Sequence, residues 1–386
     1  MKKQLGAICL LSGTAIGSGM ISLPIVLAKC GIFISCLLFF IFAVITYVSS
    51  IIRCDLNINS CANNSLSDVS KLFGNKVLGL ISDISIKLLM FSLISAYIFG
   101  LSSTLSAVLN IQQQTMTFLC IAGIFVSLYI PTKTLIQINK QMFMVLIITF
   151  FLIVMFLTSN LSANQLPEFN FDGIHILSVT IPVIFTSFGF QGSLHNMTTY
   201  VNNDVKIIKK ACLWGSLIPA IVYTIWTLCI LFIVFNTSKE FFYKMLSESV
   251  DVGELIEVLA SATHVVYIRG AFYTVSICSI ITSLIGVTLS LFEPFEKCCQ
   301  TKHTFFRKTI SGIKTVTLPG IIALILPNAF IKILNFSGIL LAIIALIIPC
   351  ILRLSIPTLN KNTIITNKYV ISFTLLLGCV IICFGF

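Results

Sequence analysis

The chain has 386 residues, of which 57% are hydrophobic and only 10% are charged, and its mean hydropathy is +1.06. Because a water-soluble domain carries about 25% charged residues, this composition excludes a soluble globular protein and indicates that membrane lipid is the main solvent. The net charge of +11 invites a nucleic-acid partner, and the distribution of the basic residues decides whether one is expected.

Apolar runs long enough to cross a bilayer recur along the whole chain. A membrane-spanning helix needs about 17–25 apolar residues, whereas a β-barrel would show alternating segments of about ten residues. The run after Met1-Lys2-Lys3 is too long for a signal peptide and ends in no small-x-small cleavage site, so we predict an uncleaved first span. We predict an all-α integral membrane protein with 11 transmembrane helices in a single domain, residues 1–386. The predicted spans are 6–27, 32–52, 78–109, 117–131, 141–159, 176–200, 211–235, 265–292, 316–331, 335–356 and 369–385.

The basic residues fall mostly on one side of this predicted topology. With the N-terminus in the cytoplasm and the C-terminus outside, 19 of the 24 Lys and Arg residues lie on the cytoplasmic side. The positive-inside rule expects this asymmetry. The surplus of positive charge is therefore a topology signal, and no nucleic-acid partner is predicted.

Two polar connections carry helix-like patterns of their own. The cytoplasmic segment 53–76 contains "LSDVSKLFG", which predicts a small interfacial helix. The outer segment 236–264 places apolar residues at helical spacing between acidic ones, which predicts a short surface helix.

The cysteines give no indication of a disulfide framework or a metal site. Most of the 14 lie inside apolar runs, where cysteine acts as a small apolar residue. Cys298, Cys299 and His303 share a basic loop, but their spacing matches no usual zinc pattern. No metal and no cofactor is therefore predicted.

Two spans lose their apolar character in mid-membrane. The first carries Thr14-Ala15-Ile16-Gly17-Ser18-Gly19, followed by Pro24, and the sixth carries "IPVIFTSFGFQGS" at 181–193. Backbone groups freed from a helix cost several kcal/mol in hydrocarbon, so such breaks persist only where protein, water or a ligand satisfies them. The N-terminus of a half-helix offers N–H groups to an anion, and its C-terminus offers carbonyls to a cation. Two facing breaks would therefore suit the carboxylate and ammonium of an amino acid.

The breaks fall in spans one and six of eleven. This arrangement predicts a five-plus-five inverted repeat, with repeat one at about 6–159, repeat two at about 176–356 and an extra span at 369–385. The alternative is that the small residues only allow close helix packing, because small-xxx-small spacing usually marks packing in membrane helices. The pairing of two hydroxyl-rich interruptions at matched positions favours a binding site.

The chain resembles the bacterial hydroxy and aromatic amino acid permeases along essentially its whole length. The stretches that carry the resemblance are "GTAIGSGMISLP" at 13–24, "IPVIFTSFGFQGS" at 181–193, "GSLIPAIVYTIW" at 215–226 and "SGILLAIIALIIPCIL" at 337–352. The first two are specific, and the last is mostly hydrophobic. The family is similar to the amino acid/polyamine/organocation superfamily, and this resemblance implies a leucine-transporter-like fold with spans one and six unwound around the substrate. It also implies a multi-pass protein of the bacterial inner membrane. The chain departs from the family at Gln191, where the permeases commonly have His.

The candidate substrate-binding residues come from three spans. We expect the backbone around Ala15, Ile16, Gly17 and Gly19 to receive the carboxylate, because glycine lets the backbone come close, with the Thr14 and Ser18 hydroxyls nearby. The ammonium should meet carbonyls near Thr186 and Ser187. Aromatic walls suit an aromatic substrate, and the expected lining is Phe188, Gly189, Phe190 and, from span three, Tyr97.

Hydroxyl and amide side chains supply the candidates for binding a coupling ion. Thr282 and Ser283 form a hydroxyl pair in span eight, and in sodium-coupled members of the fold such a pair helps to hold the ion against span one. The alternative is that the pair only bonds back to its own helix. Gln191 is a further candidate for coupling. Asp83 and Lys87, at i and i+4, are expected to form an ion pair.

The sequence thus predicts a secondary active transporter, a proton-coupled symporter that imports aromatic amino acids, with tyrosine favoured and tryptophan next. The alternative is a symporter of another neutral amino acid, with sodium as a candidate coupling ion. An enzyme is not predicted, because the chain has only four His residues and no close Asp/His/Ser set in the membrane.

Overall fold

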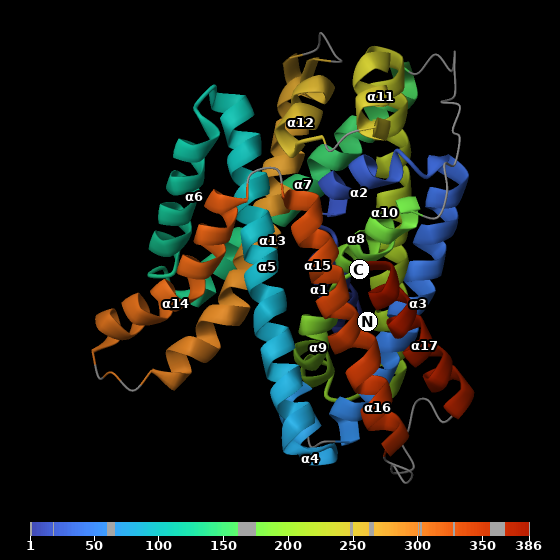
Figure 1. The fold of residues 1–386 in the computed structure, drawn as a ribbon, viewed down its shortest axis with the longest axis vertical. Coiled ribbons are helices and arrows are strands. Elements are labelled where there is room, and N and C mark those ends of the chain that lie inside the picture. The colour runs from blue at the N-terminus through green and yellow to red at the C-terminus, as the bar shows by residue number, and fades with distance from the viewer. Residues whose placement is uncertain are drawn as a thin grey trace.

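A computed structural model of the chain describes residues 2–17, 19–59, 66–160, 175–247, 250–261, 266–299, 301, 303–326, 329–355 and 367–385. These residues form helices and no strand (Figure 1). The first half contains α1 Lys2–Ala15, α2 Gly19–Leu27, α3 Gly31–Asn59, α4 Leu66–Phe73, α5 Lys76–Leu109, α6 Gln113–Ser127 and α7 Thr132–Asn160. The second half contains α8 His175–Ser187, the 3₁₀ turn η1 Gln191–Ser193, α9 Leu194–Tyr200, α10 Val205–Thr237, α11 Lys239–Ser247, α12 Val252–Ser261, α13 Val266–Cys298, α14 Thr304–Ile325, α15 Phe330–Ala342, the π-turn η2 Ile343–Ile347, α16 Ile348–Ser355 and α17 Lys368–Gly385.

The expectation of an all-helical membrane protein is confirmed, but the number of spans is smaller by length and composition. Nine described helices are long and apolar enough to cross a bilayer, and α1 with α2, bent by 52°, makes a tenth. The predicted fourth span coincides with α6, which has only 15 residues. At 1.5 Å per residue such a helix is shorter than the roughly 30 Å hydrocarbon core. The count of eleven therefore depends on α6.

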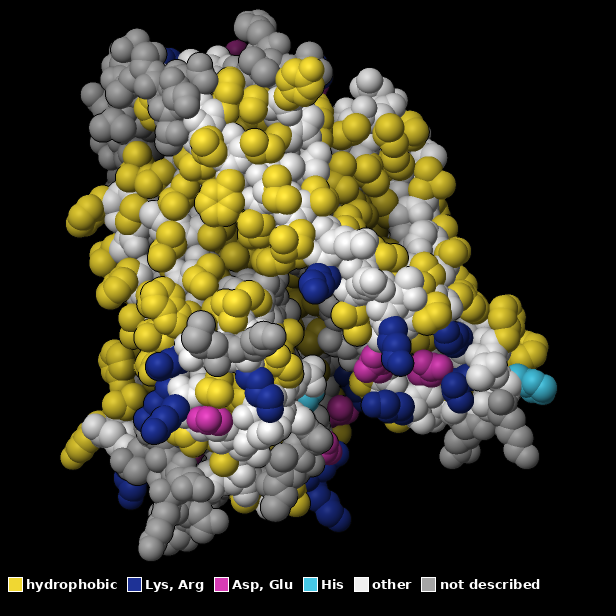
Figure 2. All heavy atoms as spheres, turned by 180° about the vertical axis from the view of Figure 1, so that it is seen from behind, with side chains coloured by type: hydrophobic (Ala, Val, Ile, Leu, Met, Phe, Trp, Pro, Cys, Tyr) yellow, Lys and Arg dark blue, Asp and Glu magenta, His cyan; other side chains and the backbone are white. Residues whose placement is uncertain are grey.

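The surface matches a protein that is embedded in lipid. Figure 2 shows hydrophobic side chains over most of one face, with Lys, Arg, Asp and Glu gathered mainly at its lower end. That is the end where α4 and α16 lie in Figure 1, while α11 and α12 lie at the opposite end. The predicted interfacial helix is α4, and the outer connection holds two short helices, α11 and α12.

The long helices pack around one large core and two smaller clusters of buried hydrophobic residues. α13 packs on α5 and α7, α15 on α8 and α5, and α10 on α1 and α3. The long helix α5 has defined ends: the side chain of Asn75 accepts a hydrogen bond from the Leu78 N–H, and Asn110 takes up a left-handed conformation with φ 53°. Both are ordinary cap chemistry for Asn.

A buried ion pair joins two helices near the charged end. Arg353 of α16 donates from Nε to Oδ2 of Asp55 in α3 at 3.0 Å. The Asp55 side chain is 0% exposed and the Arg353 side chain 10%. Within hydrocarbon, charged groups persist where they pair in this way.

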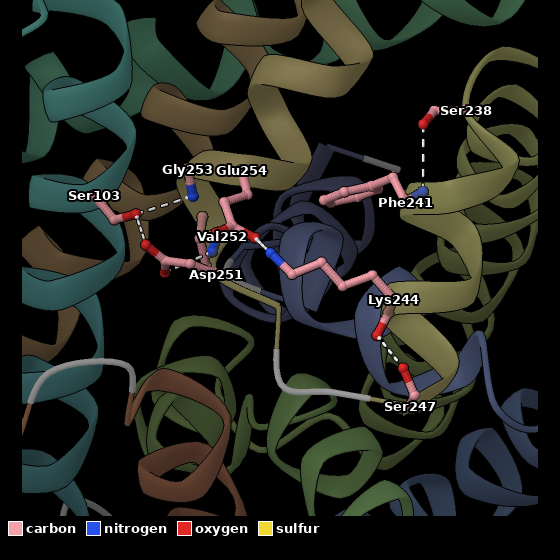
Figure 3. A network of polar contacts seen from close by, with 9 residues as sticks. All are labelled: Ser103, Ser238, Phe241, Lys244, Ser247, Asp251, Val252, Gly253 and Glu254. Carbon is pink, nitrogen blue, oxygen red and sulfur yellow. Dashed lines mark hydrogen bonds and ion pairs between the residues drawn. The ribbon is translucent and has the colours of Figure 1, made fainter.

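At the opposite end, a polar network fastens the short helix α12 to α5 (Figure 3). Asp251 accepts hydrogen bonds from the Ser103 hydroxyl and from the Val252 N–H, both at 2.7 Å. The Ser103 oxygen accepts in turn from the Gly253 N–H at 2.9 Å. Lys244 of α11 pairs with Glu254 of α12 at 2.8 Å. The two short helices are therefore held to each other and to a long span.

Candidate functional site

The first span is broken where the sequence predicts it. α1 ends at Ala15, α2 begins at Gly19, and the two axes differ by 52°. A Cβ on Gly17 would lie 1.9 Å from the Ser283 hydroxyl oxygen. A Cβ on Gly19 would lie 2.6 Å from the Tyr223 hydroxyl and 2.8 Å from that of Ser187. The two glycines are therefore needed for close contact with three other spans.

The sixth span is interrupted as well. α8 ends at Ser187, and the chain then turns through Phe188, Gly189 and Phe190 before η1 and α9 continue. The turn satisfies most of its own N–H groups: Gly189 donates to the Thr186 carbonyl at 3.0 Å and Phe190 to the Phe188 carbonyl at 2.9 Å. The carbonyl of Ser187 is left to find a donor elsewhere.

That donor comes from the third partner in the site, α10. The fully buried hydroxyl of Tyr223 lies 2.6 Å from the Ala15 carbonyl oxygen and 3.0 Å from the Ser187 carbonyl oxygen. These are the last helical residues before each of the two breaks. One turn along α10, the Trp226 Nε1–H donates to the Met20 carbonyl in the first turn of α2. α10 thus holds both halves of the first span and links them to the sixth.

Aromatic rings surround this hydroxyl. Phe188 makes an edge-to-face contact with Tyr223 at a centroid distance of 5.6 Å, and Phe39 of α3 lies at 6.1 Å. Tyr97 of α5 is buried in the same core cluster as Phe188 and Tyr223. Phe190 is also fully buried, but it packs with Ala7, Leu11 and Leu194 in a separate cluster. Of the predicted aromatic lining, Phe188 and Tyr97 are brought together, and Phe190 is not.

Several hydroxyls near the breaks bond to their own helices. Thr14 is exposed and donates to the Leu10 carbonyl, and Ser187 donates to the Val183 carbonyl. Thr186 donates to the carbonyls of Pro182 and Leu334. Such bonding to the carbonyl four residues earlier is a common way to satisfy a hydroxyl within a membrane helix. Ile16 is buried, and Ser18 lies outside the described residues.

The two hydroxyls of the predicted pair in span eight differ in their surroundings. Thr282 bonds back to the Ser279 carbonyl at 3.1 Å, which is the alternative that the sequence left open. Ser283 faces the break in span one, because its oxygen occupies the space beside Gly17. Only Ser283 is therefore placed against span one.

Gln191 makes contacts that the sequence did not predict. Its Nε2 donates to the Ser49 hydroxyl at 2.9 Å and approaches that of Ser50 at 3.5 Å, both on α3. Tyr223 and Trp226 were also missed as site residues. Both lie in the stretch "GSLIPAIVYTIW" at 215–226, and their i, i+3 spacing puts two aromatic side chains with polar tips on one helix face. That spacing was the available signal.

The family model for the tryptophan/tyrosine permease family matches residues 1–385. The chain belongs to this family. It is therefore a member of a transporter family, with several membrane-spanning helices.

Several characterised relatives match this chain over most of their length. It is 28% identical to tyrosine-specific transport system 1 of Haemophilus influenzae, over 88% of the chain and 84% of the relative. It is 26% identical to a tryptophan-specific transport protein of Pseudomonas aeruginosa, over 87% and 82%. It is 24% identical to glutamine transporter 2 of Aliivibrio fischeri, over 88% and 85%.

Among solved structures, the permease is similar to a mutant of the manganese transporter from Eremococcus coleocola. The TM-score is 0.65 with 13% identity, over 98% of this chain and 84% of the other. At this identity the likeness concerns the fold alone.

Proposed function

We propose that this permease is a proton-coupled symporter that carries aromatic amino acids into the cytoplasm by alternating access, with tyrosine favoured and tryptophan next. The observation that carries the proposal is the meeting of two interrupted spans at the Tyr223 hydroxyl, beside the ring of Phe188. Broken spans that meet near the midplane are where secondary transporters bind substrate. The tyrosine- and tryptophan-specific relatives support the aromatic class.

The substrate is proposed to bind between the two breaks. Its carboxylate would approach the backbone of Gly17 and Gly19, next to Ser18, where glycine allows close contact. Its ammonium would compete with Tyr223 for the Ala15 and Ser187 carbonyls, because one phenolic proton serves only one acceptor fully.

The aromatic ring of the substrate would meet Phe188 and Tyr97. Both side chains are buried in the same core cluster as Tyr223, and aromatic pairs add about 0.5–1.5 kcal/mol beyond the area that they bury. Gly189 and Thr186 would form the edge of the pocket at the turn. We give Phe190 a packing role, because its neighbours are α1 and α9 side chains.

Proton coupling is proposed on energetic grounds. One charge that moves inward through about 100 mV releases about 2.3 kcal/mol, and a tenfold concentration of substrate takes about 1.4 kcal/mol. One proton per substrate is therefore sufficient for accumulation well above tenfold. Sodium is the alternative ion, and Ser283 against Gly17 is the place where it would be held, with Thr282 and Gln191 as further candidates.

The topology is proposed to have 11 spans in a five-plus-five inverted repeat. The N-terminus would lie in the cytoplasm and the C-terminus outside the inner membrane of a bacterium. The charged end in Figure 2 supports this orientation, because basic residues favour the cytoplasmic side.

A second candidate substrate is a polar neutral amino acid. The glutamine transporter among the relatives favours it, because its identity to this chain is close to that of the tryptophan-specific relative. The aromatic rings around Tyr223 favour the aromatic class over this alternative.

The decisive experiment is uptake into proteoliposomes with an imposed pH or sodium gradient, using labelled tyrosine, tryptophan, phenylalanine and glutamine. We expect tyrosine accumulation that follows the pH gradient, collapses with a proton ionophore and is competed by tryptophan. Uptake that only glutamine competes would overturn the substrate assignment. Tyrosine uptake that follows sodium and ignores the ionophore would overturn the coupling assignment.

A further inference from the structure

A polar seam runs between α3 and the cytoplasmic half of the sixth span, away from the substrate site. Thr46, Ser49, Ser50 and Arg53 follow one another on α3 at i, i+3, i+4 and i+7, which places them on one helix face. All four are buried. Gln191 meets this face through its bonds to the two serines.

Arg53 is a buried cation without a described counter-charge. Arg53 is only 6% exposed, and its Nη1 has no hydrogen-bond partner within the described residues. None of the four ion pairs found there includes it. Arg353, buried to a similar degree, is paired with Asp55. An unpaired buried charge is strongly destabilising, so the fold places a guanidinium where it needs an anion.

The seam also holds two orphaned oxygen atoms. Oε1 of Gln191 and Oγ1 of Thr46 are buried and have no hydrogen-bond partner in the part of the chain that is described. The Ser49 and Ser50 hydroxyls donate to the Thr46 carbonyl, so each can only accept a hydrogen bond from Gln191. The Gln191 amide must therefore present Nε2 to them, and its Oε1 points away from them. Three unpartnered polar atoms on facing elements indicate a hydrated site with an occupant.

His195 lies one turn beyond Gln191, as Arg53 lies one turn beyond Ser49. The His195 Nδ1 contacts the Gly192 carbonyl oxygen at 2.9 Å. A carbonyl only accepts, so His195 Nδ1 carries a proton. The nearest acid along α3, Asp55, is paired with Arg353, and no ion pair among the described residues joins a carboxylate to Arg53.

We propose that Arg53 binds a small monovalent anion, a carboxylate or a halide, in the seam between α3 and the η1–α9 segment. The guanidinium supplies the charge and a donor fork, and water links the anion to Gln191 Oε1. The carboxylate could belong to a substrate on its way to the cytoplasm, and the halide would be inorganic chloride. This site is separate from the breaks at Gly17 and Phe188, and it stands whether or not the proposed substrate is right.

The test is thermal unfolding of the purified full-length protein in buffers of equal ionic strength and pH. Sodium gluconate, whose anion is a bulkier polyhydroxylated carboxylate, is the reference for sodium chloride and sodium acetate. We expect chloride, acetate or both to raise Tm by at least about 2 °C over gluconate. Acetate alone identifies the carboxylate source, and chloride alone the inorganic one.

Three variants make the assignment specific. Arg53→Gln should lose the shift, and Arg269→Gln, which removes the same charge from an exposed position on α13, should keep it. Gln191→Glu should place an internal carboxylate near Arg53 and lose the shift while the protein stays folded, which keeps the test valid if Arg53→Gln fails to fold. A wild-type protein that responds to neither anion overturns the proposal, and so does an Arg53→Gln or Gln191→Glu protein with an unchanged shift.

Discussion

The phenolic hydroxyl of Tyr223 donates a hydrogen bond to the Ala15 carbonyl oxygen over 2.6 Å. Ala15 is the last residue of α1, so this carbonyl has lost its own helical partner at the break. The same phenol also lies 3.0 Å from the Ser187 carbonyl. One side chain on an unbroken helix therefore stabilises the ends of two broken ones.

Tyr223→Phe should reduce transport strongly. It leaves two buried carbonyls without their donor, and an unmade buried hydrogen bond costs about 1–3 kcal/mol. We expect initial uptake to fall by about tenfold or more, with a smaller fall in Tm. Tyr267→Phe is the matched control, because Tyr267 is 87% exposed. Uptake by Tyr223→Phe equal to that of the control would remove Tyr223 from the mechanism.

Gly17→Ala should reduce transport, because its new Cβ would lie 1.9 Å from the Ser283 hydroxyl oxygen, which has to rotate away. The double variant Gly17→Ala/Ser283→Gly removes the obstruction and should recover a measurable part of the activity. Gly286→Ala, on the same helix as Ser283 with nothing within 4 Å of its Cβ, is the neutral control. The readout is initial uptake at equal reconstituted protein. If the double variant is no better than Gly17→Ala, then the contact with Ser283 is not the reason for the glycine.

Asp55→Asn should destabilise the protein by about 3–5 kcal/mol, since it leaves the Arg353 cation buried and uncompensated. The comparison is Asp83→Asn, which breaks an i, i+4 pair with Lys87 whose side chains are 42% and 43% exposed. That pair should contribute only about 0.2–1 kcal/mol. Unfolding in a denaturing detergent series measures both. If both variants lost the same free energy of unfolding, burial of the Asp55–Arg353 pair would not add to its contribution to stability.

The attachment of α12 to α5 should strengthen as the pH falls. Burial holds the pKa of the Asp251 carboxyl above its usual 3.8, against the hydrogen bonds from Ser103 and Val252 that lower it. The docked state thus favours the protonated Asp251 carboxyl. The stability that protonated Asp251 gives to the α12–α5 attachment is complete below pH 3.8 and is lost as the pH rises through the raised pKa.

Hydrogen exchange of the α12 amides, corrected for the intrinsic rate at each pH, measures this attachment. Protection should fall as the pH rises from about 3.5 towards neutral. Asp251→Asn should remove the dependence, because the amide does not titrate. The same pH profile in both proteins would exclude Asp251 as its source.

The sequence predicts the long helices well because an apolar run of bilayer length has few alternatives. It also locates both breaks, because Gly, Pro and hydroxyl residues together interrupt an otherwise continuous apolar helix. The hydroxyl roles are less predictable: the local i−4 carbonyl competes for every Ser and Thr, as Thr14 and Thr282 illustrate.

Other features depend on tertiary placement alone. Phe188 and Phe190 are two residues apart, yet the turn sends them into different clusters. The spacing of Tyr223 and Trp226 marks a shared helix face, but nothing local in the sequence says that this face meets the two breaks. From the sequence, Arg53 can be an ordinary basic residue of the positive side of the membrane or a buried residue that binds a ligand. Only its burial in the structure distinguishes the two.

The two pieces of the sixth span pack mainly on different neighbours. α8 packs on α15, α17 and α2, and a Cβ on Gly338 of α15 would lie 2.2 Å from the Pro182 carbonyl oxygen, whereas α9 packs mainly on α3 and α1. The turn at Phe188–Phe190 thus joins two pieces that are packed mainly on different helices. Such a junction can act as a hinge when one set of helices moves against the other. Tyr223, bonded to the last residue of α8, would then hold the turn at the point about which the two pieces move.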